Sequence, residues 1–182
     1  MPAHIITTER LILRPWKDED FAPFAQMNAD PQVREFFPSA LTRKESDASI
    51  QYFQDAYKRD GFCLFAAELI ANSEFVGFVG LQRMGFEVPG VAEPAVEIGW
   101  RLARAHWGKG LATEGARGVL RYAFETLKLP EVIAITVPNN VRSRRVMEKI
   151  GMTHHPELDF DHPRLPEGHP MRRHVLYAIR YH

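Results

Sequence analysis

This chain has a single cysteine, no net charge and no long apolar segment. Each of these features argues against a class of protein. The 182 residues include 23 basic and 23 acidic side chains, so the formal net charge is +0 at pH 7. Balanced charge argues against binding nucleic acid or a membrane surface by bulk electrostatics. No apolar run approaches the ~20 residues that span a bilayer, and the N-terminus lacks the pattern of a targeting segment. We therefore expect neither nucleic acid nor membrane among the partners.

The single cysteine, Cys63, cannot form an internal disulfide. It lies in the apolar run Phe62–Ala67, which predicts a small core residue and not a nucleophile. A chain without disulfides suits a reducing compartment, so we expect a cytoplasmic protein.

A metal site is not expected either, although six of the eight histidines lie near the C-terminus. Their spacing is irregular, no cysteine joins them and no pair sits at ligand spacing on a helix. These histidines are His154, His155, His162, His169, His174 and His182.

The remaining composition, with 45% hydrophobic residues, suits one globular domain over residues 1–182. The patterns predict the order β-α-α-β-β-β-α-β-α-β-β. A capping box, Thr42-x-x-Glu45, opens the second helix, and Pro130 ends the main one. That main helix shows an apolar stripe of Ala112, Ala116, Val119, Leu120, Ala123 and Leu127. Six of these seven strands are expected at residues 11–14, 62–70, 75–82, 95–102, 132–137 and 174–180.

The most informative segment is a glycine-rich turn, Gly108-Lys109-Gly110, between the apolar run Val96–Leu102 and the main helix. Glycines let the main chain approach phosphate oxygens closely, and the following helix N-terminus adds backbone donors and partial positive charge. The turn therefore predicts an anion site, most simply for a pyrophosphate. The Lys109 ammonium and the Thr113 hydroxyl are further phosphate contacts, with the main-chain donors dominant.

Two familiar nucleotide-binding patterns do not fit this turn. A Walker loop needs Ser or Thr after its lysine, but Gly110 follows Lys109. A dinucleotide fingerprint needs a third glycine where Thr113 stands. A nucleotide-dependent phosphotransferase is accordingly disfavoured.

Four segments in order resemble the GNAT acetyltransferase superfamily, and within it the ribosomal-protein N-terminal acetyltransferases. They are Thr8–Pro15, Ala95–Trp100, Trp107–Ala112 and Asn140-x-x-Ser143. The resemblance implies an α/β (α+β) fold of the GNAT type. Its mixed, mostly antiparallel sheet would be splayed between the fourth and fifth strands, with helices on both faces.

The resemblance also implies acetyl-coenzyme A as cosubstrate, with no metal. Its pantetheine arm would bond to the main chain around Trp100 and Leu102, and Asn140 and Ser143 would form a second cofactor motif. The cationic side chains Arg142, Arg144, Arg145 and Lys149 would either meet the 3′-phosphate or face solvent. The pyrophosphate would lie on Trp107, Gly108, Lys109, Gly110, Leu111, Ala112 and Thr113.

Two side chains are candidates for proton transfer. Met147 stands where many relatives carry a tyrosine acid, so the resemblance makes Ser143 the candidate acid; alternatively its hydroxyl bonds back to the Asn139 carbonyl. Strand alternation places Glu97 on one face with Gly99 and Arg101, and we expect it to be the general base. The alternative is that Glu97 pairs with Arg101 or with a neighbouring strand.

The expected reaction is direct acetyl transfer to a primary amine, on a protein N-terminus or on a polyamine, amino acid or antibiotic, by a monomer or homodimer. A non-catalytic acyl-coenzyme A binding module is the alternative, favoured by Met147. Val33–Pro38, with Phe36-Phe37, would line the acceptor pocket or fill core. Acids in the loop 156–170 would either attract a cationic amine or be solvated; they are Glu157, Asp159, Asp161 and Glu167.

Overall fold

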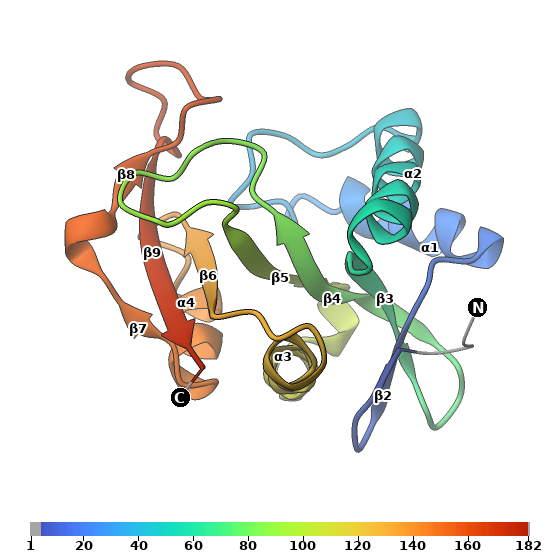
Figure 1. Ribbon diagram of the computed structural model, residues 1–182. Helices are drawn as coiled ribbons and strands as arrows, with labels where there is room; N and C mark the ends of the chain where they lie inside the picture. Colours follow the sequence, from blue (N-terminus) through green and yellow to red (C-terminus); the bar gives the residue numbers. More distant parts are fainter. Residues whose placement is uncertain (1–4, 182) are drawn as a thin grey trace.

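The computed structural model describes residues 5–181, which form one sheet with helices packed on both faces (Figure 1). Within these residues the nine strands follow the order β1-β2-β3-β4-β5-β6-β9-β7, and β8 pairs with β9. The first four residues, at which the sequence predicts no targeting segment, lie outside the described residues, as does His182. No helix within residues 5–181 has both the length and the apolar character needed to cross a bilayer.

The long elements follow the predicted order, with short strands added at both ends. Four α-helices are α1 (Phe21–Ala29), α2 (Arg43–Asp60), α3 (Leu111–Arg121) and α4 (Val141–Lys149). The strands are β1 (Ile6–Thr7), β2 (Leu11–Arg14), β3 (Leu64–Leu69), β4 (Phe75–Arg83), β5 (Val96–Leu102), β6 (Glu131–Thr136), β7 (Thr153–His154), β8 (Phe160–Asp161) and β9 (Arg173–Arg180).

The strand pairings confirm the mixed, mostly antiparallel sheet. Only β5 and β6 run parallel among the described strands, and they are paired at a single register position, Glu97 with Ile133. By contrast, β5 is paired with β4 along its whole length. The sheet therefore opens beyond Glu97, between the strands that the sequence predicts as the fourth and fifth.

Local sequence signals explain the helix ends. The Thr42 main-chain N–H donates to the Glu45 carboxylate at 2.7 Å, and the Glu45 N–H donates back to the Thr42 hydroxyl at 3.3 Å. This is the predicted capping box, and it starts α2 one residue later. Gly61, with φ of +78°, ends the same helix in the left-handed conformation that glycine adopts without strain.

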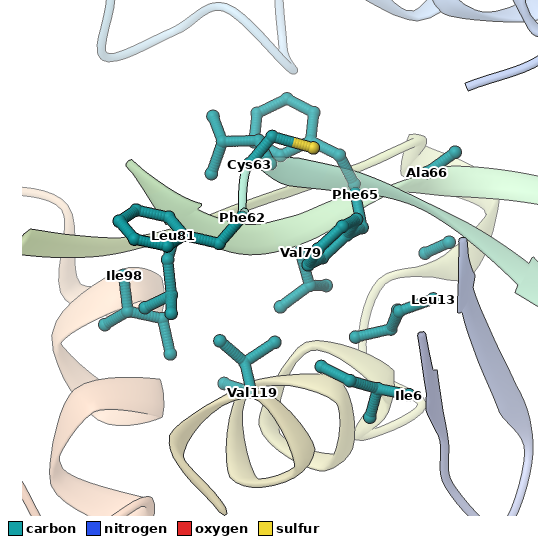
Figure 2. Close-up of a cluster of buried hydrophobic side chains, with 14 of the residues drawn as sticks. Ile6, Leu13, Phe62, Cys63, Phe65, Ala66, Val79, Leu81, Ile98 and Val119 are labelled. Carbon is teal, nitrogen blue, oxygen red and sulfur yellow. The ribbon is translucent and has the colours of Figure 1, made fainter. Parts of the chain in front are cut away.

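The main core extends over both faces of the sheet, and one part of it lies between the sheet and α3. Figure 2 shows Val79, Leu81 and Ile98 on the side of the sheet that faces Val119 of α3. The predicted stripe is confirmed, since Ala116, Val119, Leu120 and Ala123 are buried and Ala112 and Leu127 are partly buried. The helix is not regular to its end, because Tyr122–Thr126 form a π-helical turn. Cys63 is only 1% exposed, as expected for a core residue.

Candidate active site

A cavity of about 840 Å³ lies where β5 and β6 separate, and it is large enough for a sizeable ligand. It is lined by β3, β4 and β5, the α1–α2 loop, the glycine turn with α3, the β6–α4 junction, and the C-terminal loop. Most of the predicted site residues meet here, and Lys109 is the exception. The predicted residues among its lining are Glu97, Trp100, Leu102, Trp107, Gly108, Gly110, Leu111, Ala112, Thr113, Asn140 and Ser143.

The glycine turn leaves the N-terminus of α3 open. Gly108 and Gly110 have φ of +73° and +78°, a conformation that other residues seldom adopt. No side chain caps α3, although Thr42 caps α2 and Asn140 caps α4. The first N–H groups of α3, in Leu111–Thr113, therefore lack helical partners and face the cavity. Unpartnered N–H groups and the helix dipole are together suited to bind an anion.

Two residues that the sequence analysis did not single out hold this turn in place. The Glu114 carboxylate accepts hydrogen bonds from the Thr8 hydroxyl at 2.6 Å and from the Arg10 main-chain N–H at 2.7 Å. The Arg10 guanidinium donates to the same carboxylate at 2.7 Å and to the Lys109 carbonyl at 2.9 Å. Arg10 and Glu114 are 104 residues apart in the sequence. Contacts from the Thr8–Pro15 segment therefore stabilise the glycine turn.

Trp107 braces the segment between β5 and the glycine turn. Its indole N–H donates to the Leu102 carbonyl at 2.8 Å, and the Arg142 guanidinium lies 4.4 Å above its ring. The carbonyl of Leu102 is therefore already engaged. The other main-chain groups on the β6-facing edge of β5, beyond Glu97, have no strand partner among the described residues.

The Asn140 side chain starts α4. Its amide oxygen accepts a hydrogen bond from the Ser143 N–H at 3.2 Å, and its amide nitrogen donates to the Thr136 hydroxyl at 3.0 Å. Ser143 is partly buried and lines the cavity. The Asn139 carbonyl accepts from the Val141 N–H at 2.9 Å, and no bond from the Ser143 hydroxyl to it is found within the described part of the chain.

Glu97 lies where the sheet begins to open. Its carboxylate accepts a hydrogen bond from the Gln82 side chain of β4 at 2.7 Å, and the main-chain N–H of Ile135 also donates to it. Burial raises the pKa of Glu97 to about 7, against the opposing effect of these two hydrogen bonds. Of the partners considered from sequence, the neighbouring strand is the one found, and Arg101 is not.

The α1–α2 loop and the C-terminal loop line the remaining side of the cavity, mainly with apolar and aromatic side chains. Val33, Phe36, Phe37 and Pro38 of the α1–α2 loop line it, so both phenylalanines face the cavity. The C-terminal loop contributes His162, Arg164, Leu165, Met171 and His174.

Of the two alternatives for the acids of the loop 156–170, the one in which they face the cavity is not found, because two of them have other partners and Glu157 and Glu167 are exposed. Asp159 accepts from the His154 ring and from the Leu176 N–H, each at 3.0 Å. Asp161 pairs with Arg172 and Arg173. None of the four loop acids lines the cavity. Within residues 5–181 there is also no group of three His, Cys, Asp or Glu residues placed to hold a metal ion.

The opened sheet, the uncapped helix and the glycine turn together define an acetyltransferase of the GNAT class. Residues 10–153 match the family described as an acetyltransferase (GNAT) domain, and the chain belongs to this family. It is therefore an N-acetyltransferase.

Individual relatives agree with this assignment. The FsC-acetyl coenzyme A-N(2)-transacetylase of Aspergillus fumigatus is 35% identical over 156 residues, covering 81% of this chain and 64% of that protein. A GNAT-family acetyltransferase from Bacillus anthracis superposes with a TM-score of 0.80 at 29% identity, over 96% of this chain and 97% of that one. Mycobacterium smegmatis RimJ, solved in complex with CoA-disulfide, shares the fold with a TM-score of 0.73 at 21% identity, over 93% and 81%.

Proposed function

We propose that this N-acetyltransferase uses acetyl-coenzyme A and transfers the acetyl group directly to a primary amine. The observation that carries the proposal is one cavity holding both an open helix N-terminus for a pyrophosphate and a carboxylate with a pKa near neutrality. The Aspergillus relative, whose name states acetyl-coenzyme A as its acyl donor, supports the choice of cosubstrate.

The residues present suit this cosubstrate. The N–H groups of Leu111–Thr113 would bind the pyrophosphate, and a side chain at Gly108 would project into open space beside them. The unpaired edge of β5 near Trp100 would bond to the pantetheine arm. Arg145 and Lys149 of α4 line the same cavity and would meet the 3′-phosphate. Acetyl-coenzyme A itself supplies an activated acetyl thioester.

Glu97 would act as the general base. With a pKa of about 7, about half of its carboxylates are ionised at neutral pH and able to accept a proton. Glu97 takes the proton that the amine loses as the N–C bond forms, through a water molecule where the distance requires one. An α-amine of pKa ~8 needs this help less than a lysine of pKa ~10.4, by roughly 3.3 kcal/mol.

Ser143 would donate a proton toward the sulfur as the C–S bond breaks, so that amide and free thiol are the products. Cys63 takes no part, since it is buried among core residues and does not line the cavity. Burial also raises the pKa of its thiol, which disfavours the nucleophilic thiolate. Transfer is therefore direct, without an acyl-enzyme.

The test is acetyl-coenzyme A binding by calorimetry together with thiol release against a panel of primary amines. Binding with amine-dependent release would support the proposal. Binding with no release from any amine would favour the non-catalytic module suggested by Met147. Failure to bind acetyl-coenzyme A would refute the proposal.

A further inference from the structure

Arg101 is a cation without a counter-ion on the wall of the cavity. Its Nη1 donates to the Asn28 side-chain oxygen at 2.9 Å. Its Nε is buried without a hydrogen-bond partner, and no carboxylate among residues 5–181 is paired with it. Proteins seldom leave a sequestered guanidinium uncompensated, because the lost hydration is not replaced.

A second cation makes this position more unfavourable. The Arg101 and Arg34 guanidinium groups lie 4.3 and 4.2 Å from the centre of the same ring, that of Phe37. Burial first, and the charge of Arg34 second, lower the pKa of Arg101 to about 9. The side chain therefore stays charged at neutral pH, and this part of the cavity has a local excess of positive charge.

A buried polar chain holds Arg101 in this place. Asn28 of α1 is fully buried, and its amide nitrogen donates to the Ser46 hydroxyl of α2 at 2.9 Å. The rings of Phe37 and Phe78 also pack against the Arg101 guanidinium, at 4.3 and 5.1 Å. Contacts from α1, the α1–α2 loop and β4 thus orient a cation that gains no ion pair in return. Such preorganisation at a local energetic cost is typical of ligand-binding groups.

Arg101 also lies on the correct side of the sheet for an acceptor. It shares a strand face with Glu97, and both line the cavity. Glu97 and Arg101 are four positions apart along the strand, so their Cα atoms are about 13 Å apart. Both side chains are long, so the distance between their charged groups can be shorter. The aromatic wall of Phe36 and Phe37 lies on the same side as Arg101. A small amine near Glu97 could therefore place a second group at Arg101.

We infer that the acceptor is an amino acid, whose carboxylate binds the Arg101 guanidinium while its amine faces the thioester. This inference rests on the proposed function and selects among the acceptors that it permits. A polyamine is disfavoured, because this side of the cavity holds the cations Arg101 and Arg164 and none of the loop acids. Burial lowers the pKa of His162 and His174, so these two side chains add no charge at neutral pH. Arginine is well suited to this role because its planar donors match a carboxylate.

The kinetic test compares each of the twenty amino acids with its C-terminal amide, which keeps the amine and removes the negative charge. Rates are referred to the concentration of neutral amine, because amidation also changes the amine pKa. The wild type should acetylate its best amino acid with a kcat/KM at least about tenfold above that of the amide, mainly through KM. R101Q should abolish this preference by lowering kcat/KM for the acid at least about tenfold more than kcat/KM for the amide.

Two variants serve as controls. R101K keeps the charge without the planar fork and should retain part of the preference. R43Q removes one exposed arginine of α2, which pairs with Asp47 outside the cavity, and should leave the preference intact. Melting curves check that R101Q is folded.

A binding arm separates this inference from the proposed function. Calorimetry with the N-acetyl amino acids and their amides needs no turnover. Tighter binding of the acids that R101Q abolishes would uphold the inference, even if no amine released thiol and the proposed function failed. The inference would be overturned by equal binding of acid and amide, by no binding of either, or by a preference that R101Q retains. In each case, turnover of other amines would still support the proposed function.

Discussion

Replacing Glu97 with glutamine should slow acetyl transfer at alkaline pH about tenfold more than at acid pH. The substitution keeps the shape of the side chain and an acceptor for the Gln82 amide, but it removes the ionisable group. Because the pKa of Glu97 is raised to about 7, the active carboxylate form is lost as the pH falls through that value.

The expected magnitude follows from this pKa. Near pKa 7 the carboxylate is about 9% ionised at pH 6 and about 91% at pH 8, a tenfold difference. A positioned general base contributes about 10²–10⁴-fold. The ratio of wild-type to E97Q kcat/KM should therefore be about 10² or more at pH 8, and about tenfold smaller at pH 6. Taking the ratio cancels the titration of the amine substrate, which affects both proteins equally.

The assay is continuous thiol release with a chromogenic disulfide. Cys63, the single cysteine, is 1% exposed and should add little background. A second variant tests the cause of the pH dependence. The Gln82 amide favours the charged carboxylate, so Q82L should raise the pKa of Glu97. The rise of kcat/KM with pH should then occur at higher pH than in the wild type. A ratio that stays constant between pH 6 and 8 would refute the assignment of Glu97 as base.

Two further predictions concern the cofactor side. G108A should weaken acetyl-coenzyme A binding by at least about tenfold in calorimetry, because an alanine resists the left-handed conformation of the turn. G61A is the matched control: Gly61 has φ of +78° and equally open surroundings, but it ends α2 away from the cavity, so G61A should share the loss of stability and keep the affinity. Equal affinity in both variants would contradict the role of the turn. S143A should reduce kcat less than about tenfold, because a thiol of pKa ~8.5 needs little protonation to leave at neutral pH; a loss beyond a hundredfold would make Ser143 more important than we infer.

Short-range patterns in the sequence were sufficient for much of this fold. The Thr42–Glu45 box, the apolar stripe that begins in α3 and the glycine turn each depend on short, regular spacings between residues that are close in the sequence. Local backbone geometry and the periodic spacing of apolar residues determine these features, so they could be predicted before any tertiary contact was known. The opening of the sheet between the fourth and fifth predicted strands was expected only from the resemblance to the GNAT superfamily.

Charged side chains were less predictable, because their state depends on residues far away in the chain. The loop acids Asp159 and Asp161 are recognisable from the sequence, but their partners in β9, the Leu176 main-chain N–H and the Arg173 guanidinium, are not. These pairings keep both carboxylates out of the cavity, so the alternative in which the loop acids attract a cationic amine is not found. The Arg10–Glu114 contact was equally invisible, since its partners are 104 residues apart.

The sequence by itself determined the family, the helix caps and the anion-binding turn, because these follow from residue types at short fixed spacings. Only the tertiary structure decided the chemical state of β5. The register between β4 and β5 places Gln82 beside Glu97. Packing of α1 against the sheet sequesters Arg101 without an acid. A pKa near 7 and an uncompensated cation arise from burial and from distant neighbours, which a linear pattern does not encode.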